Sequence, residues 1–197
     1  MIAEDQTMVR QALVALLELE PDIEVVAQAA TGDEALAMAA KHRPDVAVLD
    51  IEMPGPSGIE VASQLSRSGF AGKVVIVTTF DRPGYLRAAM TAGASGFLLK
   101  DAPAADLAAA IRRVAVGERV VDPSLAAAAL AQGDSPLTER ETEVLTASAG
   151  HDAIADIAAR LHLSPGTVRN HLSGAIQKLG ARNRAEAVEI AQQKGWL

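Results

Sequence analysis

The sequence predicts an α/β domain with a doubly wound, five-stranded parallel sheet, followed by a small all-α domain. The first part alternates short apolar runs with segments of helical period, which is typical of parallel strands whose connecting helices cover both faces of a sheet. From Leu137 onward every segment has a helical pattern, and the 197 residues suffice for one mid-sized and one small domain. We therefore expect a first domain over residues 1–117, a linker over 118–136 and a second domain over 137–197.

The strands of the first domain are expected where Val, Ile and Leu concentrate in short runs. These runs are residues 1–3, 23–29, 46–49, 73–78 and 96–99. The first run holds only Met1, Ile2 and Ala3, whereas strands usually contain about 5–6 residues. We expect either that residues upstream are missing from this numbering or that the first strand is truncated.

Helices are expected between these strands. An apolar stripe marks the first of them, and it consists of Val9, Leu13, Leu16 and Leu17. Residues Thr31 to Glu34 have the pattern of a capping box, which predicts the start of the second helix. The other three helices are expected over residues 58–66, 83–92 and 103–116.

The linker is expected to contain Val120–Val121 and to continue as an Ala-rich, helix-favouring stretch over 124–132. Turn-forming residues at 133–136 then precede the second domain. Ser164 and Pro165 have the pattern of an N-cap and a first helical residue, and the short turn before them fits a helix-turn-helix. Residues Thr138 to Glu141 have the pattern of a capping box, which predicts the start of the first helix of this domain. Its helices are expected over residues 138–149, 153–161, 164–179 and 183–194.

Composition excludes several classes of protein. The chain has no cysteine, so it cannot contain a disulfide framework, a thiolate metal site or a cysteine nucleophile. No apolar stretch approaches the ~20 residues of a membrane span, and the acidic Glu4-Asp5 pair argues against a signal peptide. We expect a cytoplasmic protein with no direct membrane insertion.

The net charge of -7 is distributed unevenly along the chain. Residues 1–122 contain 11 basic and 17 acidic side chains, a charge of -6, whereas residues 123–197 contain 7 and 8, a charge of -1. Residues 164–184 contain four basic side chains and no acidic one, a local charge of +4. Because a local basic face matters more for nucleic-acid binding than the global sum, the overall acidity is a weak argument against DNA binding.

Four of the expected strands end at residues of complementary chemistry. Asp50 follows the third strand, the Glu4-Asp5 pair follows the first, Thr78 ends the fourth, and Lys100 follows the fifth. In open α/β sheets the reactive groups gather outside the carboxyl ends of the strands. Carboxylates, a hydroxyl and an ammonium arranged in this way suit Mg²⁺-dependent transfer of a phosphoryl group onto Asp50. Each residue alone also has an ordinary interpretation as a turn, surface or strand residue, and only their combination favours chemistry.

Six segments carry a resemblance to a known family. They are AEDQ, LDIEMPGPSG, VTTF, GASGFLLKD, LTERETEVL and SPGTVRNHLS. The first domain resembles the receiver domain of bacterial two-component response regulators, whose fold is flavodoxin-like (CheY-like). The second resembles the LuxR-type helix-turn-helix of the NarL/FixJ subfamily. The segments TTFDRPGY, GTVRNHLS and KGW are similar to those of regulators that control fatty-acid desaturase genes with a membrane-bound thermosensing kinase.

The resemblance implies a role for each residue of the strand-end cluster. Asp50 is the expected phosphoacceptor and, with Asp5, supplies carboxylates to Mg²⁺. The backbone carbonyl of Glu52 is a third metal ligand, and Glu4 acts mainly through water. Lys100 is expected to pair with the phosphoryl oxygens. Thr78 is expected to hydrogen-bond the phosphoryl group, with help from the backbone amides of Ile51 and Thr79.

The resemblance also implies partners and a switch. A sensor histidine kinase is the expected phosphoryl donor, and phosphorylation is expected to produce a homodimer that binds double-stranded promoter DNA. Thr78 moving toward the phosphoryl group would let the Phe97 ring turn inward, although Phe97 could also be a plain core residue. The chain is not expected to be an enzyme beyond phosphotransfer to its own receiver domain.

The helix that begins at Ser164 is the expected DNA-reading element. Arg169, Asn170 and Ser173 lie near its N-terminal end, where a recognition helix places side chains against base edges. Other residues are expected to contact phosphates, and they are Thr167, His171, Lys178 and Arg182. The last helix, over 183–194, could form a dimer contact or close the core of its own domain.

Two other functions remain open at this point. A phosphatase of the haloacid dehalogenase type also uses an aspartate at a strand end, with a second acid two residues later, where this chain has Glu52. A ligand-sensing LuxR-type regulator would share the DNA-binding domain but has no need of Asp50 and Lys100. Incubation with Mg²⁺ and acetyl phosphate separates the three hypotheses.

Overall fold

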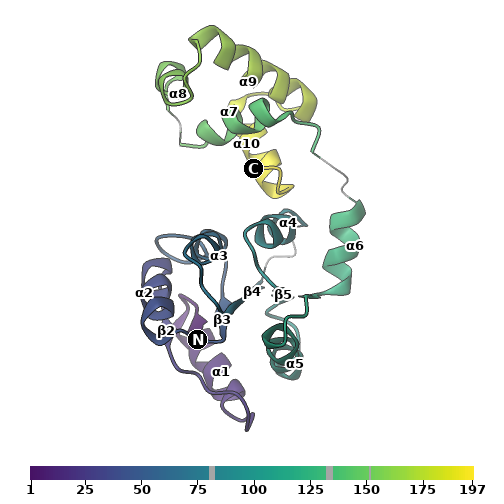
Figure 1. Cartoon of the computed structure of the whole chain (residues 1–197). Coiled ribbons are helices and arrows are strands. Elements are labelled where there is room, and N and C mark those ends of the chain that lie inside the picture. The colour runs from purple at the N-terminus through teal and green to yellow at the C-terminus, as the bar shows by residue number, and fades with distance from the viewer. Residues whose placement is uncertain (80–82, 132–134, 151) are drawn as a thin grey trace. The chain divides into compact units, whose positions relative to one another are not determined.

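The computed structural model describes residues 1–79, 83–131, 135–150 and 152–197 (Figure 1). The chain forms two compact units, one that contains Met1–Asp81 and Ala89–Ala126 and one that contains Arg82–Ala88 and Ala127–Leu197. Within the described ranges, no helix is both long and apolar enough to cross a membrane. The middle of the TTFDRPGY segment (80–82) and residues 132–134 of the predicted linker lie outside these ranges.

The first unit contains a parallel sheet with strands in the order β2-β1-β3-β4-β5-β6. The strands are β1 (Ile2–Ala3), β2 (Gln28–Ala29), β3 (Val46–Leu49), β4 (Lys73–Thr78), β5 (Gly96–Leu99) and β6 (Val120–Val121). All neighbouring strands pair in parallel. The order reverses at β1, between β2 and β3, and such a switch point is where open α/β sheets place their sites. The doubly wound parallel sheet is confirmed.

Two strands differ from the prediction. β6 adds a sixth strand, because Val120 and Val121 pair with Gly96 and Phe97 of β5 instead of belonging to a linker. β2 is limited to Gln28–Ala29, whereas the prediction began at residue 23. β1 offers only Ile2 and Ala3 as pairing partners for β2. Residues 23–27, which the prediction included in this strand, alternate between partly buried and exposed positions but form no strand.

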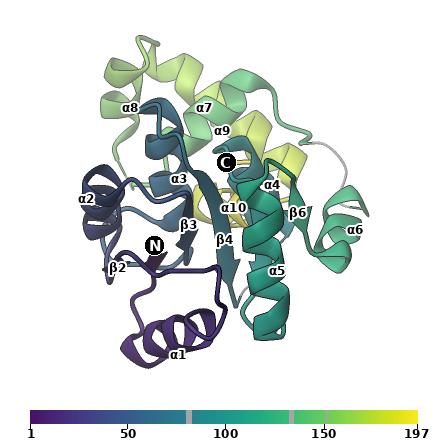
Figure 2. The ribbon, with the colours of Figure 1, turned by 60° about the horizontal axis from the view of Figure 1, so that its bottom comes forward.

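Helices cover both faces of this sheet. They are α1 (Thr7–Leu17), α2 (Gly32–His42), α3 (Gly58–Arg67) and α5 (Ala104–Ala115). The chain also contains α4 (Pro83–Thr91) and the Ala-rich α6 (Pro123–Ala131). Figure 2 shows α5 in front of the sheet, where α5 and α1 share a core with it. α2 and α3 contact each other on the opposite face (Figure 1). In α1, Val14 is buried, whereas the predicted core residue Leu16 is 43% exposed. Leu16 directly precedes the buried Leu17 and so lies about 100° from it around the helix.

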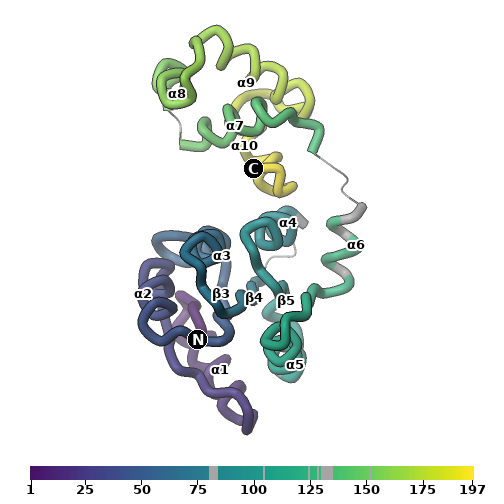
Figure 3. The backbone as a smooth tube through the Cα atoms, viewed as in Figure 1, coloured from purple at the N-terminus to yellow at the C-terminus, as the bar shows by residue number. Residues whose placement is uncertain are grey.

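The second unit is a helix-turn-helix domain with its own core. Figure 3 traces its backbone through α7 (Glu139–Ala147), α8 (Ile154–Arg160), α9 (Pro165–Leu179) and α10 (Arg184–Gln193). The four predicted helices are therefore confirmed. Ala187, Val188 and Ala191 of α10 are buried against this core. Of the two alternatives for the last helix, the structure supports closure of its own domain.

Candidate functional site

Asp50 lies at the carboxyl end of β3 and is 5% exposed. Its backbone amide donates to the carbonyl of Ala3 in β1 (2.9 Å), which holds the ends of β1 and β3 side by side. The amide of Ile51 donates to Asp50 Oδ1 (2.8 Å). The apolar run before Asp50 thus delivers a fixed, largely buried carboxylate to the edge of the sheet.

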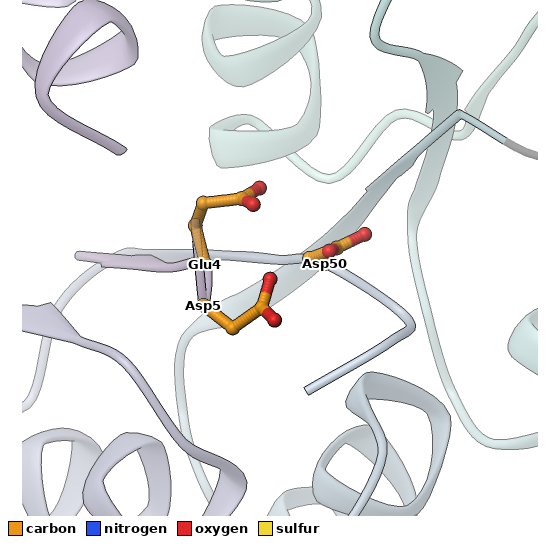
Figure 4. Close-up of side chains that lie close together, drawn as sticks. All are labelled: Glu4, Asp5 and Asp50. Carbon is orange, nitrogen blue, oxygen red and sulfur yellow. The ribbon is translucent and has the colours of Figure 1, made fainter. Parts of the chain in front are cut away.

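Three carboxylates meet at this edge. One oxygen from each of Glu4, Asp5 and Asp50 lies within 4.8 Å of the others (Figure 4). Asp5 is exposed, whereas Glu4 is 1% exposed. Carboxylate oxygens are the protein ligands that Mg²⁺ prefers, so this donor set fits the predicted metal. Glu52, whose backbone carbonyl is the predicted third ligand, follows in the loop after Asp50, and its side chain is exposed.

Lys100 is the counter-ion of this cluster. Its Nζ lies 2.6 Å from Glu4 Oε2 and 2.9 Å from Asp50 Oδ2, and its side chain is 9% exposed. Burial works against the charged ammonium, but the hydrogen bonds and charges of Glu4 and Asp50 outweigh it and raise the pKa of Lys100. Burial raises the pKa of the Glu4 carboxyl, and the charge of Asp50 adds to this effect against the opposing influence of Lys100. One lysine therefore serves two buried acids.

Thr78 and Phe97 lie on the same face of the sheet. Thr78 ends β4, and its carbonyl accepts from the amide of Lys100 (2.8 Å), so the ends of β4 and β5 are held together. Both Thr78 and Phe97 are 0% exposed. The Phe97 ring is therefore enclosed in this structure.

Sequence reasoning missed two residues that position the cluster. Arg10 Nη1 donates to the carbonyl of Glu4 (2.5 Å), which ties the β1–α1 loop to α1. At Gly58, a Cβ atom would come within 1.9 Å of the carbonyl oxygen of Asp50. Only glycine therefore allows α3 to begin this close to the end of β3. The Gly58 signal was visible in the loop sequence, but the contact partner was not.

α9 is built as predicted. Its N-cap is Ser164, whose Oγ accepts from the amide of Thr167 (3.0 Å), and Pro165 follows at the first helical position. Val168 and Leu172 are buried in the domain core. The predicted base-reading residues lie on the other side of the helix, and all three are exposed: Arg169, Asn170 and Ser173. Gln177, which the sequence analysis missed, is exposed four residues after Ser173 and extends the same stripe.

The predicted phosphate-contacting residues differ in their surroundings. Lys178 Nζ lies 2.6 Å from Glu141 Oε2, and Arg182 Nε lies 3.0 Å from Glu186 Oε2. Thr167 shares a hydroxyl–hydroxyl hydrogen bond with the N-cap, and His171 is half-buried. Much of the local charge of +4 is therefore balanced within the domain, whereas Arg169 makes no ion pair with any described residue.

Comparison with known proteins identifies both units. Residues 1–112 match the response regulator receiver domain. Residues 135–191 match the bacterial regulatory proteins of the luxR family. Together the two matches span Glu4, Asp5, Asp50 and Lys100 and the whole of α7, α8 and α9.

Full-length relatives share this arrangement. The transcriptional regulatory protein YvfU of Bacillus subtilis is 50% identical over 196 residues, which cover 100% of this chain and 98% of YvfU. The transcriptional regulatory protein DesR of the same organism is 46% identical, covering 100% of this chain and 97% of DesR. The crystal structure of the response regulator ChrA is 35% identical, covers 100% of this chain and 96% of ChrA, and has a TM-score of 0.59. The chain belongs to the two-component response regulators that carry a LuxR-type DNA-binding domain.

Proposed function

We propose that Asp50 accepts a phosphoryl group from a sensor histidine kinase, and that phosphorylation controls a homodimer that binds promoter DNA through α9. The observation that carries the proposal is the ion pair of Lys100 with Asp50 and Glu4, beside the exposed carboxylate of Asp5. This arrangement places a nucleophilic oxygen, a cation and metal-binding oxygens within one small volume.

The chemistry follows from these residues. An oxygen of Asp50 forms a bond to phosphorus, the bond from phosphorus to the donor imidazole breaks, and the imidazole leaves with the electron pair. Lys100, already 2.9 Å from Asp50, is placed to offset charge on the phosphoryl oxygens. Bound Mg²⁺ supplies the further positive charge that a carboxylate needs to approach a phosphate. Asp5, Asp50 and the carbonyl of Glu52 are the residues that would hold it.

The phosphoryl group adds about 1.5–2 negative charges to this edge. Thr78 is the proposed sensor of that charge, because it ends the strand beside β5 and its carbonyl accepts from the amide of Lys100. Phe97, on the same face, is the proposed second element. Since its ring is fully buried, Phe97→Ala would open a cavity and cost about 3–5 kcal/mol.

Phe97→Leu is therefore the better test of this switch. We expect the leucine variant to be phosphorylated like the parent but to dimerise less, because a smaller side chain no longer transmits the repacking. Light scattering with and without acetyl phosphate measures the effect. Phosphate-induced dimerisation equal to that of the parent would assign Phe97 to the core alone.

DNA reading is proposed for the exposed stripe of α9. Arg169 can bind guanine and Asn170 adenine in bidentate fashion. We expect Arg169→Ala to lose about 1–3 kcal/mol of discrimination at one base pair. Selection of binding sites from a random duplex library by parent and variant measures this change. Identical selected sequences would show that Arg169 does not read bases.

The target gene is a finer proposal. The identity to DesR and the TTFDRPGY, GTVRNHLS and KGW segments support a fatty-acid desaturase or another membrane-lipid gene. YvfU is 50% identical, however, so identity alone does not favour one target. Binding of the phosphorylated protein to the desaturase promoter of its own genome, compared with the promoter beside its own gene, tests this assignment.

The phosphoacceptor is tested by incubating the full chain with Mg²⁺ and acetyl phosphate. We expect one stable phosphoryl group per chain by intact-mass spectrometry, and none in Asp50→Asn. Asp45→Asn is a matched control, because Asp45 is an exposed acid just before the opposite end of the same strand. Rapid multiple turnover would instead support a phosphatase, and inertness would support a ligand-sensing regulator.

A further inference from the structure

The carboxylate of Glu141 joins the start of α7 to the far end of α9. Glu141 is the third residue of α7 and forms a capping box with Thr138. Its Oε2 accepts from the amide of Thr138 (2.7 Å) and from the Thr138 hydroxyl (3.0 Å). The same oxygen lies 2.6 Å from Lys178 Nζ, 37 residues further along the chain. The Glu141 side chain is 9% exposed. A helix cap thus doubles as the anchor for a lysine of another helix.

The carboxylate of Glu141 lies close to the backbone of α9. At Gly174 a Cβ atom would come within 2.7 Å of Glu141 Oε1. Gly174 and Lys178 are four residues apart and therefore share one face of α9. Glu141 Oε1 therefore lies next to Gly174, and Oε2 is bound by Lys178.

This face of α9 is not the face that carries Arg169. Lys178 follows Arg169 by nine residues, which is about two and a half turns of an α-helix, so the two side chains leave the helix on opposite sides. Both side chains are exposed to solvent, but Arg169 makes no ion pair with a described residue, whereas the Lys178 side chain, 37% exposed, places its Nζ 2.6 Å from Glu141 Oε2 of α7. When Arg169 faces the groove, the Lys178 side chain therefore leaves the helix on the side away from it.

We propose that Lys178 is a positioning residue, which fixes the orientation of the recognition helix through Glu141 and does not contact the DNA backbone. The inference rests on the proposed DNA-reading role of α9 and replaces the prediction that Lys178 binds phosphate. Arg169 then depends on the Glu141–Lys178 pair for its angle of entry into the groove.

The salt dependence of DNA binding separates the two roles of Lys178. Each lost phosphate contact reduces the slope of log K against log[salt] by about 0.9 on duplex DNA. The probe is a duplex selected by the phosphorylated parent protein from a random library. For Lys178→Met we expect binding about tenfold weaker, as for a lost charged hydrogen bond, with an unchanged slope. We expect recovery in Lys178→Arg, because arginine can also pair with Glu141.

The two roles of Lys178 predict opposite changes in DNA affinity for Glu141→Gln. A positioning pair predicts that the glutamine variant binds the duplex more weakly, and that the double variant with Lys178→Met is no weaker than either single one. A phosphate-binding Lys178 would be released by the same change, so binding would be equal or stronger. Glu139→Gln, in the first turn of the same helix, controls for the loss of one negative charge.

Two further measurements keep the result decisive. Trp196, the single tryptophan, lies in the domain being tested. Its fluorescence shows whether each variant is folded at the assay temperature. Arg169→Ala reports separately on the DNA-reading face. If Arg169→Ala binds like the parent, the proposed reading face is wrong. If Lys178→Met lowers the salt slope by about 0.9 while Glu141→Gln binds at least as well as the parent, the positioning role is overturned.

Discussion

Two glutamate–lysine pairs, one in each unit, have the same separation and opposite consequences. Glu4 and Lys100 are 2.6 Å apart in the receiver domain, and Glu141 and Lys178 are 2.6 Å apart in the helix-turn-helix domain. Burial raises the pKa of the Glu4 carboxyl above its usual value. Burial also acts on Glu141, but Lys178 and Thr138 outweigh it and lower the pKa of that carboxyl. Distance alone therefore does not decide what an ion pair does.

The difference lies in how many partners each carboxylate has. Glu141 has a lysine of its own and two hydrogen bonds from Thr138. Glu4 shares Lys100 with Asp50 and accepts one hydrogen bond at Oε1, from the amide of Gln6 (3.2 Å). Its buried Oε2 lies 2.6 Å from Lys100 Nζ without a well-aligned hydrogen bond among the described residues. A satisfied pair stabilises one geometry. A pair with too little positive charge is ready to accept a metal ion or to rearrange when a phosphoryl group arrives.

Removal of each lysine is the strongest test of this comparison. We expect Lys100→Met to lower the free energy of unfolding by about 3–5 kcal/mol, because two buried carboxylates lose their cation. Lys178→Met should cost only about 1–2 kcal/mol, because Thr138 still binds Glu141. Urea unfolding followed by far-UV circular dichroism and by Trp196 fluorescence measures the two units.

The same unfolding experiment is repeated with added Mg²⁺. The Lys100 variant leaves three acidic side chains without the lysine, so added Mg²⁺ should stabilise this variant more than the parent. Lys41→Met on the exposed surface of α2 is the control for loss of a lysine. Equal costs for Lys100→Met and Lys178→Met would remove the distinction between a functional and a structural pair.

The sequence predicted the parts of the site that come from local patterns. The end of each apolar run located Asp50, Thr78 and Lys100, because parallel strands bring their carboxyl ends to one edge. The caps at Ser164 and at Thr138 to Glu141 located α9 and α7. These signals need only neighbours in sequence.

Contacts between distant segments could not be predicted in this way. Lys178 looked like a free cation because its partner Glu141 lies 37 residues earlier and had already been assigned to a capping box. The pairing of Val120–Val121 with β5 was missed because two valines after a turn have no period to measure. Whether Glu4 pairs with Lys100 depends on the rotamer of the buried glutamate, and no sequence pattern indicates that rotamer.

Two glycines, one beside the Asp50 backbone and one beside the Glu141 carboxylate, give the next test. At Gly58 the obstacle to a Cβ is the backbone carbonyl of Asp50, which cannot move without β3. At Gly174 it is the end of the Glu141 side chain, which can rotate. We expect Gly58→Ala to cost about 1–3 kcal/mol. We expect Gly174→Ala to be nearly neutral in stability, because alanine gains up to about 1 kcal/mol within a helix. Urea unfolding measures both variants, and a larger cost at Gly174 would mean that Glu141 is held rigidly.

The smallest expected effect is the pH dependence of stability, and it has opposite signs for the two glutamates. Above the usual glutamate pKa of 4.5 and up to the raised pKa of Glu4, the folded protein binds more protons than the unfolded chain, so Glu4 makes stability fall as pH rises. Below 4.5 and down to the lowered pKa of Glu141, the unfolded chain binds more protons, so the contribution of Glu141 is lost as pH falls.

Glu4→Gln and Glu141→Gln isolate these contributions when unfolding free energies are measured from pH 3.5 to pH 8 (about the range accessible without acid unfolding). The difference between Glu4→Gln and the parent should become more favourable to the variant as pH rises above 4.5. The difference for Glu141→Gln should become less favourable as pH rises toward 4.5 and then level off. Glu189→Gln, on the exposed side of α10, is the matched control. Parallel curves of unfolding free energy against pH for the Glu4 and Glu141 variants would show that both carboxylates are equally satisfied. The two units would then differ in the number of partners of each carboxylate, but that difference would have no energetic consequence.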